Sequence, residues 1–328
     1  MEPLIPTQSD FSPHSILVTG GAGFIGSHIV EALLKAGAKK VRVLDNLSTG
    51  RIENLSSLKT YEASGNYEFM MGDITNLETC HKACVGMTLI CHQAALGSVP
   101  RSIDDPLKSH INNVDGFLNL LIAAKEAGLK RIVYASSSSV YGDDESLIKV
   151  EGIEGQPLSP YAITKCVNEL YAHVFTSLYG LECMGLRYFN VFGPRQNPDG
   201  CYAAVIPKFI KQVSQGLAPT INGDGQYSRD FTFVDNVVKA NLLALTTTNK
   251  QCYGQAFNIG TGSNVTINAL YEGIMKGLDK DKALCRPIYG PNRPGDVPHT
   301  QASIDKAKAY LGYEPTVGFI EGLQRTFK

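Results

Sequence analysis

The chain has no tryptophan, no excess of charge of one sign and no long apolar run. Its 30 Lys and Arg residues are balanced by 31 Asp and Glu residues and are spread along the sequence, so no basic stripe is available for nucleic acid. No stretch approaches the roughly 18 consecutive apolar residues that a membrane-spanning helix needs. The opening segment, residues 1–13, is polar and contains proline, unlike a signal peptide. We therefore expect a protein that binds neither nucleic acid nor membrane.

The eight cysteines include no Cys-x-x-Cys pair. Cys80 and Cys84 flank His81 but lack the second half of a zinc site, and the histidines are not clustered. We therefore predict no metal. Most of the thiols are expected to be buried and reduced, which suits a cytoplasmic protein.

A glycine-rich turn stands between a predicted strand and a predicted helix. The run Ser15–Gly20 is β-branched and apolar, and Phe24–Lys35 has the apolar period of a helix. The turn between them carries glycines at positions 20, 21, 23 and 26. Glycine allows a tight turn and lets a pyrophosphate approach the backbone N–H groups at the start of the helix. This arrangement predicts a dinucleotide site.

An acidic residue follows at the spacing that dinucleotide-binding proteins use. The next predicted strand begins at Lys40 and ends in Asp45, 19 residues after Gly26. A carboxylate at this place can accept hydrogen bonds from both hydroxyls of an adenosine ribose, which favours NAD over its 2′-phosphorylated form.

Alternation of strands and helices continues through the first two thirds of the 328 residues. Further strands are predicted at 67–73, 88–95, 131–136 and 184–190, with a helix at 113–127. Such repetition predicts an α/β fold with a Rossmann-like, doubly wound parallel sheet. Later segments are rich in loops, so we expect a smaller C-terminal substrate-binding lobe. We assign residues 14–190 to an NAD-binding domain, with returns near 228–259, and residues 191–328 mainly to the interleaved lobe.

Three polar side chains downstream of the glycine turn point to redox chemistry at a carbon–oxygen bond. Tyr161 and Lys165 stand four residues apart, so on a helix they share one face. A nearby ammonium can stabilise the phenolate of a tyrosine, whose ordinary pKa of about 10 makes it a poor base. Ser137, in a serine cluster, supplies a hydroxyl.

The chain resembles the extended short-chain dehydrogenase/reductases, and within them the nucleotide-sugar 4-epimerases. The resemblance covers nearly the whole chain and is closest to bacterial UDP-N-acetylglucosamine 4-epimerases. It is carried by Thr19-Gly-Gly-Ala-Gly-Phe-Ile-Gly-Ser, Asp45-Asn-Leu-Ser-Thr-Gly, His92-Gln-Ala-Ala-Leu-Gly-Ser-Val-Pro-Arg-Ser, Ser137-Ser-Ser-Val-Tyr-Gly, Ser159-Pro-Tyr-Ala-Ile-Thr-Lys, Arg187-Tyr-Phe-Asn, Tyr202-Ala-Ala-Val-Ile-Pro-Lys and Arg293-Pro-Gly-Asp.

The resemblance implies NAD as cofactor and a set of residues that hold it. These are Gly20, Gly23, Phe24, Ile25, Asp45, Asn46, Gly50, Asp73, Ile74, Gln93, Ala94, Ala95, Asn112, Tyr161 and Lys165. Asp73 would accept from the adenine amino group, although an aspartate after a strand is also an ordinary helix N-cap. The spacing alone does not distinguish Asn112 from Asn113, and the family motif favours Asn112.

The resemblance also assigns the chemistry. Tyr161 would take the proton of the sugar C4 hydroxyl, directly or through Ser137, and Lys165 would hold the nicotinamide ribose and depress the tyrosine pKa. A 4-keto sugar would then turn its other face and be reduced again. Substrate would be held by Ser98, Ser137, Ser138, Ser139, Tyr161, Asn190, Ala204, Val205, Asn222, Arg229, Arg293, Asp296 and Thr300, with the two arginines on the pyrophosphate.

Four positions bear on which UDP-sugar is the substrate. Thr300 stands where family members that act on galactose carry a tyrosine, and a small residue leaves volume for an acetamido group. Ser138 and Ser139 replace the carboxyls of related dehydratases, which disfavours elimination of water. Asn190 stands where UDP-glucuronate epimerases tend to carry threonine. We therefore expect UDP-N-acetylglucosamine and UDP-N-acetylgalactosamine as substrates, with UDP-glucose and UDP-galactose as candidates beside them.

Alternatives remain at this stage. A serine-rich pocket also suits UDP-glucuronate, and net oxidation or decarboxylation of a UDP-sugar would use the same fold. Binding of NAD without turnover is disfavoured, because sensors of this fold typically lack the tyrosine or the lysine that this chain retains at positions 161 and 165. The family resemblance further implies a homodimer.

Overall fold

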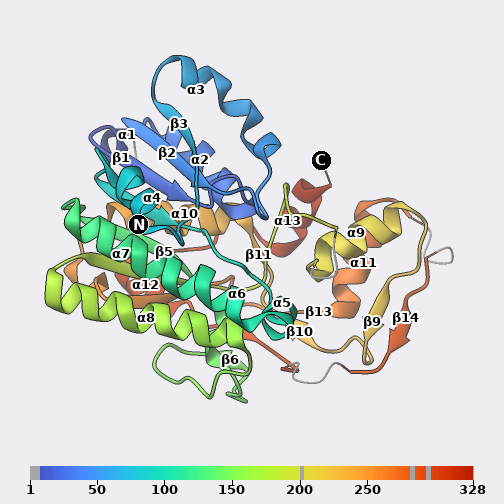
Figure 1. Cartoon of the computed structure of the whole chain (residues 1–328). Coiled ribbons are helices and arrows are strands. Elements are labelled where there is room, and N and C mark those ends of the chain that lie inside the picture. Colours follow the sequence, from blue (N-terminus) through green and yellow to red (C-terminus); the bar gives the residue numbers. More distant parts are fainter. Residues whose placement is uncertain (1–7, 200–202, 281–284, 293–296, 328) are drawn as a thin grey trace.

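A parallel seven-stranded sheet forms the centre of the protein, in the order β12-β7-β5-β4-β1-β2-β3 (Figure 1). The computed structural model describes residues 8–199, 203–280, 285–292 and 297–327, so the predicted site residues Arg293 and Asp296 lie outside the described part of the chain. The strands are β1 (Ser15–Thr19), β2 (Lys40–Asp45), β3 (Tyr67–Met71), β4 (Leu89–His92), β5 (Arg131–Ser137), β7 (Glu182–Tyr188) and β12 (Gln255–Ile259).

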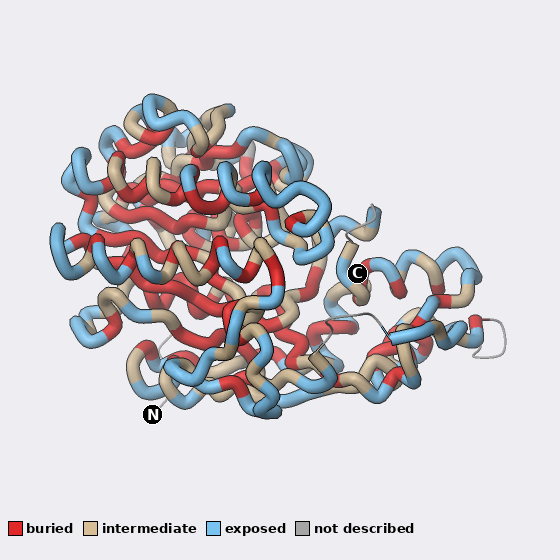
Figure 2. Tube along the Cα trace, turned by 60° about the horizontal axis from the view of Figure 1, so that its bottom comes forward, coloured by how far each residue is buried: buried red, intermediate tan, exposed pale blue. Residues whose placement is uncertain are grey.

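Helices cover both faces of this sheet, and the strands supply apolar side chains to each face. In β1, Ile16 and Val18 join one buried cluster and Leu17 joins the other. The first cluster is completed by α2 (Phe24–Lys35), α10 (Val234–Thr246) and α12 (Asp305–Leu311). The second is completed by α4 (Leu77–Cys84), α7 (Gly116–Glu126) and α8 (Pro160–Tyr179). Figure 2 shows the buried strands between the partly exposed helices. The doubly wound α/β fold predicted from the sequence is confirmed.

Local sequence signals fix the helix that carries Tyr161. Ser159 caps α8, since its hydroxyl accepts a hydrogen bond from the Ala162 N–H at 3.1 Å, and Pro160 occupies the first turn. Gly180 ends the helix in the left-handed region, with φ of 69°. The helix predicted at 113–127 is divided in the structure, because a π-helical turn, η2 (Ile111–Asp115), precedes α7.

The order of the strands opens a crevice beside β1. The chain proceeds from β1 to β2 and β3 on one side, and β4 then pairs with β1 on the other side. Loops that leave β1 and β4 therefore diverge at their carboxyl ends, which is where open α/β sheets bind ligands. Gly20 follows β1 and Gln93 follows β4, so both predicted site residues lie at this point.

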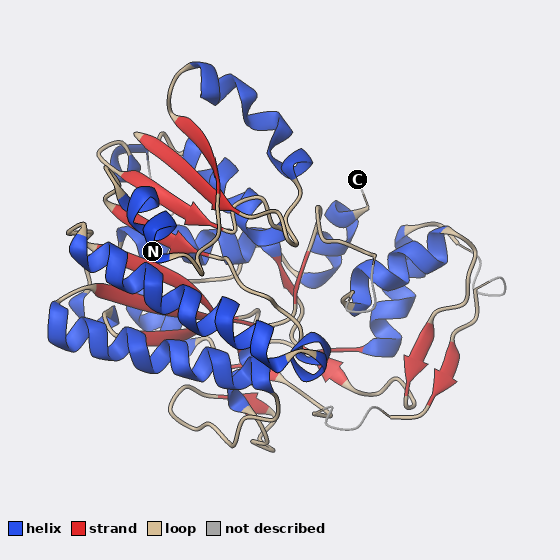
Figure 3. Ribbon diagram, viewed as in Figure 1, coloured by secondary structure: helices blue, strands red, loops and turns tan. Residues whose placement is uncertain are grey.

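A smaller lobe lies to the right of the sheet in Figures 1 and 3. Its core contains Phe209, Leu270 and Leu323, which come from α9 (Val205–Ser214), α11 (Ile267–Gly277) and α13 (Phe319–Thr326). Short parallel strands β9 (Thr220–Asn222) and β14 (Ile288–Gly290) form its outer edge.

The chain crosses between the two parts more than once. After α9 it returns to the main body as α10, and β12 extends the sheet beside β7. The remaining elements are α1 (Gln8–Phe11), η1 (Ile52–Leu58), α3 (Lys59–Ala63), α5 (Val99–Asp104), α6 (Pro106–His110), η3 (Ser138–Tyr141), β6 (Ile148–Lys149), β8 (Val191–Phe192), β10 (Ser228–Arg229), β11 (Thr232–Phe233), η4 (Lys250–Cys252), β13 (Val265–Thr266) and β15 (Gln301–Ala302). Within the described ranges, no helix has both the length and the apolar character to cross a membrane.

Candidate active site

A cavity of about 400 Å³ occupies the crevice at the carboxyl ends of β1 and β4. With one exception, it is lined by every residue that the sequence assigns to the cofactor: Gly20, Gly23, Phe24, Ile25, Asp45, Asn46, Asp73, Ile74, Gln93, Ala94, Ala95, Asn112, Tyr161 and Lys165. The exception, Gly50, lines a neighbouring cavity of about 490 Å³. The fold thus brings these segments, which are distant in sequence, to a single site.

The glycine turn is packed too closely for a side chain at Gly20. Its φ is +67°, and a Cβ added there would lie 2.6 Å from the Ala94 backbone nitrogen. A Cβ on Gly26 would overlap the Gly20 carbonyl oxygen. Helix α2 begins directly after Gly23, which has no side chain to cap it. The N–H groups of its first turn are therefore oriented for an anionic ligand.

Asp45 supports the glycine turn and faces the same cavity. Its carboxylate accepts hydrogen bonds from the Ala22 N–H at 2.9 Å and the Leu47 N–H at 2.8 Å. A carboxylate has about four lone-pair positions, so these two bonds leave capacity for ligand hydroxyls. This geometry is compatible with the ribose contact predicted from the sequence.

Asp73 is held by the loop around it and does not cap α4. Its carboxylate accepts from the Thr75 N–H at 2.8 Å and the Asn46 amide at 2.7 Å. Burial alone would raise the pKa of Asp73, but these hydrogen bonds outweigh it and keep the pKa below its usual value. The N-cap of α4 is Asn76, which accepts from the Thr79 N–H at 2.9 Å.

The two adjacent asparagines have different surroundings. Asn112 lines the cavity. Asn113 is buried, and its side chain accepts from the Leu96 N–H at 2.8 Å and donates to the Thr164 hydroxyl at 3.2 Å. Asn113 therefore ties the loop after β4 to helix α8. Spacing in the sequence does not distinguish the two asparagines, and the structure gives them different surroundings.

Tyr161, Lys165 and Ser137 meet between α8 and the end of β5. The Lys165 ammonium donates to the Ala135 carbonyl oxygen at 2.7 Å and lies 5.8 Å from the centre of the Tyr161 ring. Burial lowers the pKa of Lys165 to about 8, and the Glu169 carboxylate opposes that shift.

The pKa of Tyr161 is set differently from the sequence expectation. Burial raises it above the ordinary value of 10.0, and a hydrogen bond with the Ser137 side chain acts in the opposite direction. Lys165, to which the resemblance gives the role of lowering this pKa, directs its ammonium to the Ala135 carbonyl oxygen.

A second cavity, of about 560 Å³, lies on the other side of Tyr161. Its lining includes seven of the predicted substrate residues: Ser137, Ser138, Ser139, Tyr161, Asn190, Arg229 and Thr300. A third cavity, of about 210 Å³, lies in the lobe and is lined by Asn190, Val205, Asn222 and Arg229. Asn190 and Arg229 line both cavities, so they mark the place where the two adjoin.

Of the predicted substrate residues that the structure describes, two lie outside these two cavities. Ala204 lines the cavity that contains Gly50. Ser98 caps α5, and its hydroxyl accepts from the Arg101 N–H at 3.3 Å. Its φ of 139° is one of five positive values among the described non-glycine residues, and Asn190, with φ of 30°, is another. Backbone strain of this kind gathers at ligand sites.

Thr300 has a buried hydroxyl that faces no hydrogen-bond partner among the described residues. Its backbone N–H donates to the Ser228 carbonyl oxygen at 3.1 Å, which fixes the residue against β10. A buried hydroxyl without a partner is costly. Within the described ranges, His, Cys, Asp and Glu side chains do not gather in groups of three that could hold a metal.

Comparison with known proteins identifies the family of the chain. The NAD dependent epimerase/dehydratase family matches residues 16–260. A UDP-glucose 4-epimerase of Mycolicibacterium smegmatis is 38% identical over 312 residues, which cover 94% of this chain and 96% of the relative. The chain therefore belongs to the NAD dependent epimerase/dehydratase family.

Two solved structures are similar over almost the whole chain. A UDP-N-acetylglucosamine 4-epimerase from Methanobrevibacter ruminantium, in complex with UDP-N-acetylmuramic acid, has a TM-score of 0.88 at 40% identity and covers 95% of this chain and 96% of its own. A UDP-glucuronic acid 4-epimerase from Bacillus cereus, in complex with UDP-glucuronic acid and NAD, has a TM-score of 0.86 at 33% identity. The match covers 95% of this chain and 98% of that one.

The first cavity fits NAD, the cofactor of this family. At Gly20 any Cβ would fill the space beside the glycine turn. The start of α2 faces the cavity, and the carboxylates of Asp45 and Asp73 also line it. The residues that would hold the pyrophosphate are those of the glycine turn, and Asp45 would hold the adenosine ribose. Lys165 and Tyr161 line the same cavity and would face the nicotinamide.

Proposed function

We propose that this protein is an NAD-dependent 4-epimerase that interconverts UDP-N-acetylglucosamine and UDP-N-acetylgalactosamine, with UDP-glucose and UDP-galactose as further substrates. The observation that carries the proposal is the position of Tyr161, which lines both the cofactor cavity and the cavity that contains the serine cluster and Thr300. A sugar in the second cavity can therefore place its C4 between this phenol and the cofactor site.

The residues around Tyr161 suit proton transfer at a sugar hydroxyl. NAD, when bound, supplies the reversible oxidation of the sugar at C4. Tyr161 would take the C4 hydroxyl proton and return it, with Ser137 as the bridging hydroxyl. Because burial raises the pKa of the phenol, a positive charge close to it is needed to hold the phenolate, and Lys165 is the buried cation on the same helix.

The nucleotide would extend from the sugar cavity into the lobe. Arg229 lies where the second and third cavities adjoin, which is a suitable place for a diphosphate. Its guanidinium donates to the carbonyl oxygens of Ser228 and Pro298, so its position is fixed. The cavity beyond it, lined by Val205, Asn222 and Phe209, would hold the uracil. Firm binding of the UDP part leaves the keto sugar free to turn.

Thr300 is the residue that favours an N-acetylated sugar. It is small, its hydroxyl has no partner among the described residues, and it lines the sugar cavity. An acetamido group would gain volume there, because threonine is small. The hydroxyls of Ser138 and Ser139 line the same cavity and supply no carboxyl that could eliminate water.

UDP-glucuronate is the second candidate substrate, because three serine hydroxyls in the cavity could donate to its carboxylate. A lysine, Lys149, also lines this cavity, but its ammonium is paired with the Asp144 carboxylate at 3.1 Å. The charge of Lys149 is therefore already balanced and is not available to a glucuronate carboxylate. For this reason the proposal favours an acetylated sugar.

The substrate is tested by incubating the purified protein with UDP-N-acetylglucosamine, UDP-glucose and UDP-glucuronate separately and following the C4 epimers by proton NMR. We expect the acetylated product to form fastest. Thr300→Tyr should slow turnover of the acetylated sugar more than that of UDP-glucose, because it removes volume. Faster conversion of UDP-glucuronate would refute the argument from Thr300 and leave the proton-transfer site intact.

We also propose that the protein is a homodimer formed through α5, α6 and α8. An apolar stripe runs along these helices: Ile103 and Leu107 are 60% and 68% exposed, and Leu170, Val174 and Leu178 are 67%, 44% and 69% exposed. The last three are spaced by four residues, so they lie on one face of α8. Contiguous exposed apolar side chains of this kind mark an interface.

The dimer is tested by light scattering during gel filtration. The native chain should elute with twice the mass of 35.5 kDa, and Leu170→Lys with the monomer mass. Leu217→Lys is the matched control, because Leu217 is 53% exposed but lies in the lobe. A monomeric native chain would refute the proposal.

A further inference from the structure

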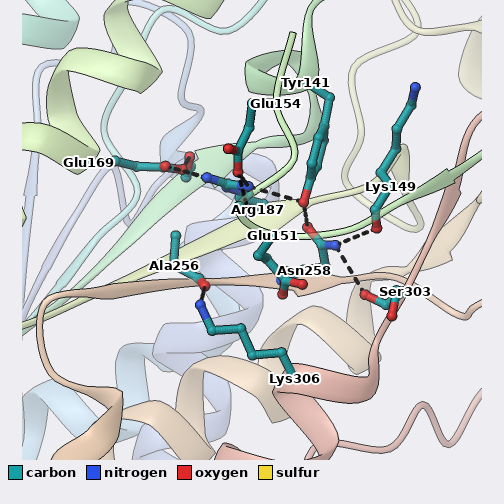
Figure 4. Close-up of polar contacts among 12 residues, drawn as sticks. Tyr141, Lys149, Glu151, Glu154, Glu169, Arg187, Ala256, Asn258, Ser303 and Lys306 are labelled. Carbon is teal, nitrogen blue, oxygen red and sulfur yellow. Dashed lines mark hydrogen bonds and ion pairs between the residues drawn. The ribbon is translucent and has the colours of Figure 1, made fainter. Parts of the chain in front are cut away.

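A buried cluster of charged side chains connects α8 to β7 (Figure 4). None of its charged residues was assigned a role in the site from the sequence. Arg187 of β7 donates to both oxygens of the Glu169 carboxylate, at 2.9 and 2.7 Å. Its third nitrogen donates to Glu154 at 2.5 Å and to the Tyr141 hydroxyl at 3.0 Å. Tyr141 in turn lines the sugar cavity.

Glu169 also reaches the strand that carries Ser137. The Ser136 hydroxyl donates to the Glu169 carboxylate at 2.5 Å, and Ser136 directly precedes Ser137 at the end of β5. On α8, Glu169 follows Lys165 by one helical turn and Tyr161 by two. One carboxylate therefore links the strand that holds the serine hydroxyl to the helix that holds the tyrosine and the lysine.

The charges of this cluster are complementary to Lys165. Two carboxylates, Glu154 and Glu169, share one guanidinium, Arg187, which leaves the three side chains with a net charge of −1. Lys165 is the buried cation next to them along α8, and its ammonium is bonded to the Ala135 carbonyl oxygen rather than to a carboxylate. A buried ammonium needs a nearby negative charge, and Glu169, one turn away on α8, is the carboxylate of this group that acts on Lys165.

The other titratable groups around Lys165 do not supply that charge. From β4, His92 is buried and neutral, since burial, with Lys165 as a second cause, lowers its pKa to about 3. From β5 and β7, burial raises the pKa of Tyr134 and Tyr188, so these phenols stay protonated. On α8 itself, burial raises the pKa of Tyr161.

We propose that Glu169 is a positioning residue for the reaction at Tyr161: it fixes Ser137 against the phenol through Ser136, and it keeps the Lys165 ammonium charged. This inference rests on the proposed function. Glu169 does not line either of the two cavities beside Tyr161, so it acts through its neighbours. The two roles are separable, because the link to Ser136 is geometric and the effect on Lys165 is electrostatic.

The electrostatic role is tested with Glu169→Gln, which keeps the shape and removes the charge. The rate should be measured in the holoenzyme as kcat against pH, on whichever UDP-sugar the native protein converts fastest. The native rate should fall as Lys165 loses its proton, near its pKa of about 8. Loss of a nearby opposite charge shifts a pKa by about one unit or more. At pH 8 the charged fraction of Lys165 then falls from about one half to about one tenth, and kcat by about fivefold.

Two further variants separate charge from geometry. Glu154→Gln removes the other carboxylate on the same guanidinium. Glu169, and not Glu154, is the carboxylate that raises the pKa of Lys165, so this variant should leave the pH dependence near that of the native enzyme. Ser136→Ala removes the link to β5 without a change of charge. It should lower kcat at every pH and leave the alkaline limb of the profile where it is. An equal shift of the alkaline limb in Glu169→Gln and Glu154→Gln, or no shift in either, would overturn the electrostatic role.

A readout that needs no turnover keeps the proposal separate from the proposed function. Because the folded pKa of Lys165 lies below its ordinary 10.5, the free energy of unfolding rises with pH between these two values. In Glu169→Gln this rise should begin at a pH lower by about one unit, and in Glu154→Gln at the native pH. If Glu169→Gln does not fold, Glu169→Asp keeps the charge and should retain the native alkaline limb with a lower kcat. A shifted limb in Glu169→Asp would refute the proposal.

Discussion

Replacement of Gly20 by alanine should remove NAD binding and destabilise the protein beyond the effect of backbone strain. Two effects add at this position. The φ of +67° is unfavourable for any residue with a Cβ, by about 1–2 kcal/mol. The new methyl group would also lie 2.6 Å from the Ala94 nitrogen, and overpacking of this kind costs about 1–3 kcal/mol. We expect a total loss of about 2–5 kcal/mol in the free energy of unfolding.

The chain offers a matched control for the strain alone. Gly86 has a φ of +75°, and a Cβ there would meet nothing within 4 Å. Gly86→Ala should therefore cost about 1–2 kcal/mol and leave the NAD content unchanged. Urea denaturation measures the free energies of unfolding. The NAD content is measured by heating the purified protein and reading the absorbance of the NAD that is released. The account of the turn is refuted if Gly20→Ala retains NAD and loses no more stability than Gly86→Ala.

Three other predictions concern the same site. Lys165→Met should abolish the rise in the free energy of unfolding between pH 8 and 10.5. In the native protein this rise arises because burial lowers the pKa of Lys165 to about 8. Urea denaturation at both ends of that pH range measures it. Asp45→Ala should lower the NAD content, since the Ala22 N–H in the glycine turn and the Leu47 N–H after β2 lose their acceptor, and unchanged NAD content would contradict this. Asn113→Ala should lower kcat, and it should lower the free energy of unfolding by about 1–3 kcal/mol, because the buried Leu96 N–H loses its partner. Asn112→Ala should instead weaken NAD binding and leave the stability unchanged.

Features that depend on a few neighbouring residues could be predicted from the sequence. The strand Lys40–Asp45 and the helix Phe24–Lys35 have the bounds that we predicted, because apolar period and turn glycines determine them locally. The convergence of Gly20, Asp73 and Gln93 on one cavity follows from the rule that parallel strands open their carboxyl ends on one edge.

Features that depend on the packing of distant segments could not be predicted. The bond between Glu169 and Arg187 joins residues 18 apart whose elements become neighbours only in the folded sheet. Neither residue belongs to a motif that names its partner. Similarly, the pKa of Tyr161 depends on how deeply α8 is buried against β5, and spacing on a helix wheel gives no measure of that burial. The π-helical turn at Ile111–Asp115 places Asn112 in the cavity and Asn113 in the core, and no sequence signal showed it.

The measurement that tests the central claim most directly is epimerisation of UDP-N-acetylglucosamine in deuterated water, followed by proton NMR at C4, for the native protein and Tyr161→Phe. If the phenol of Tyr161 exchanges only the hydroxyl proton and the oxidation at C4 is reversed within the site, the product is UDP-N-acetylgalactosamine that retains its original hydrogen at C4. Tyr161→Phe should then retain NAD and form no product. Deuterium at C4, or undiminished turnover by Tyr161→Phe, would contradict the account.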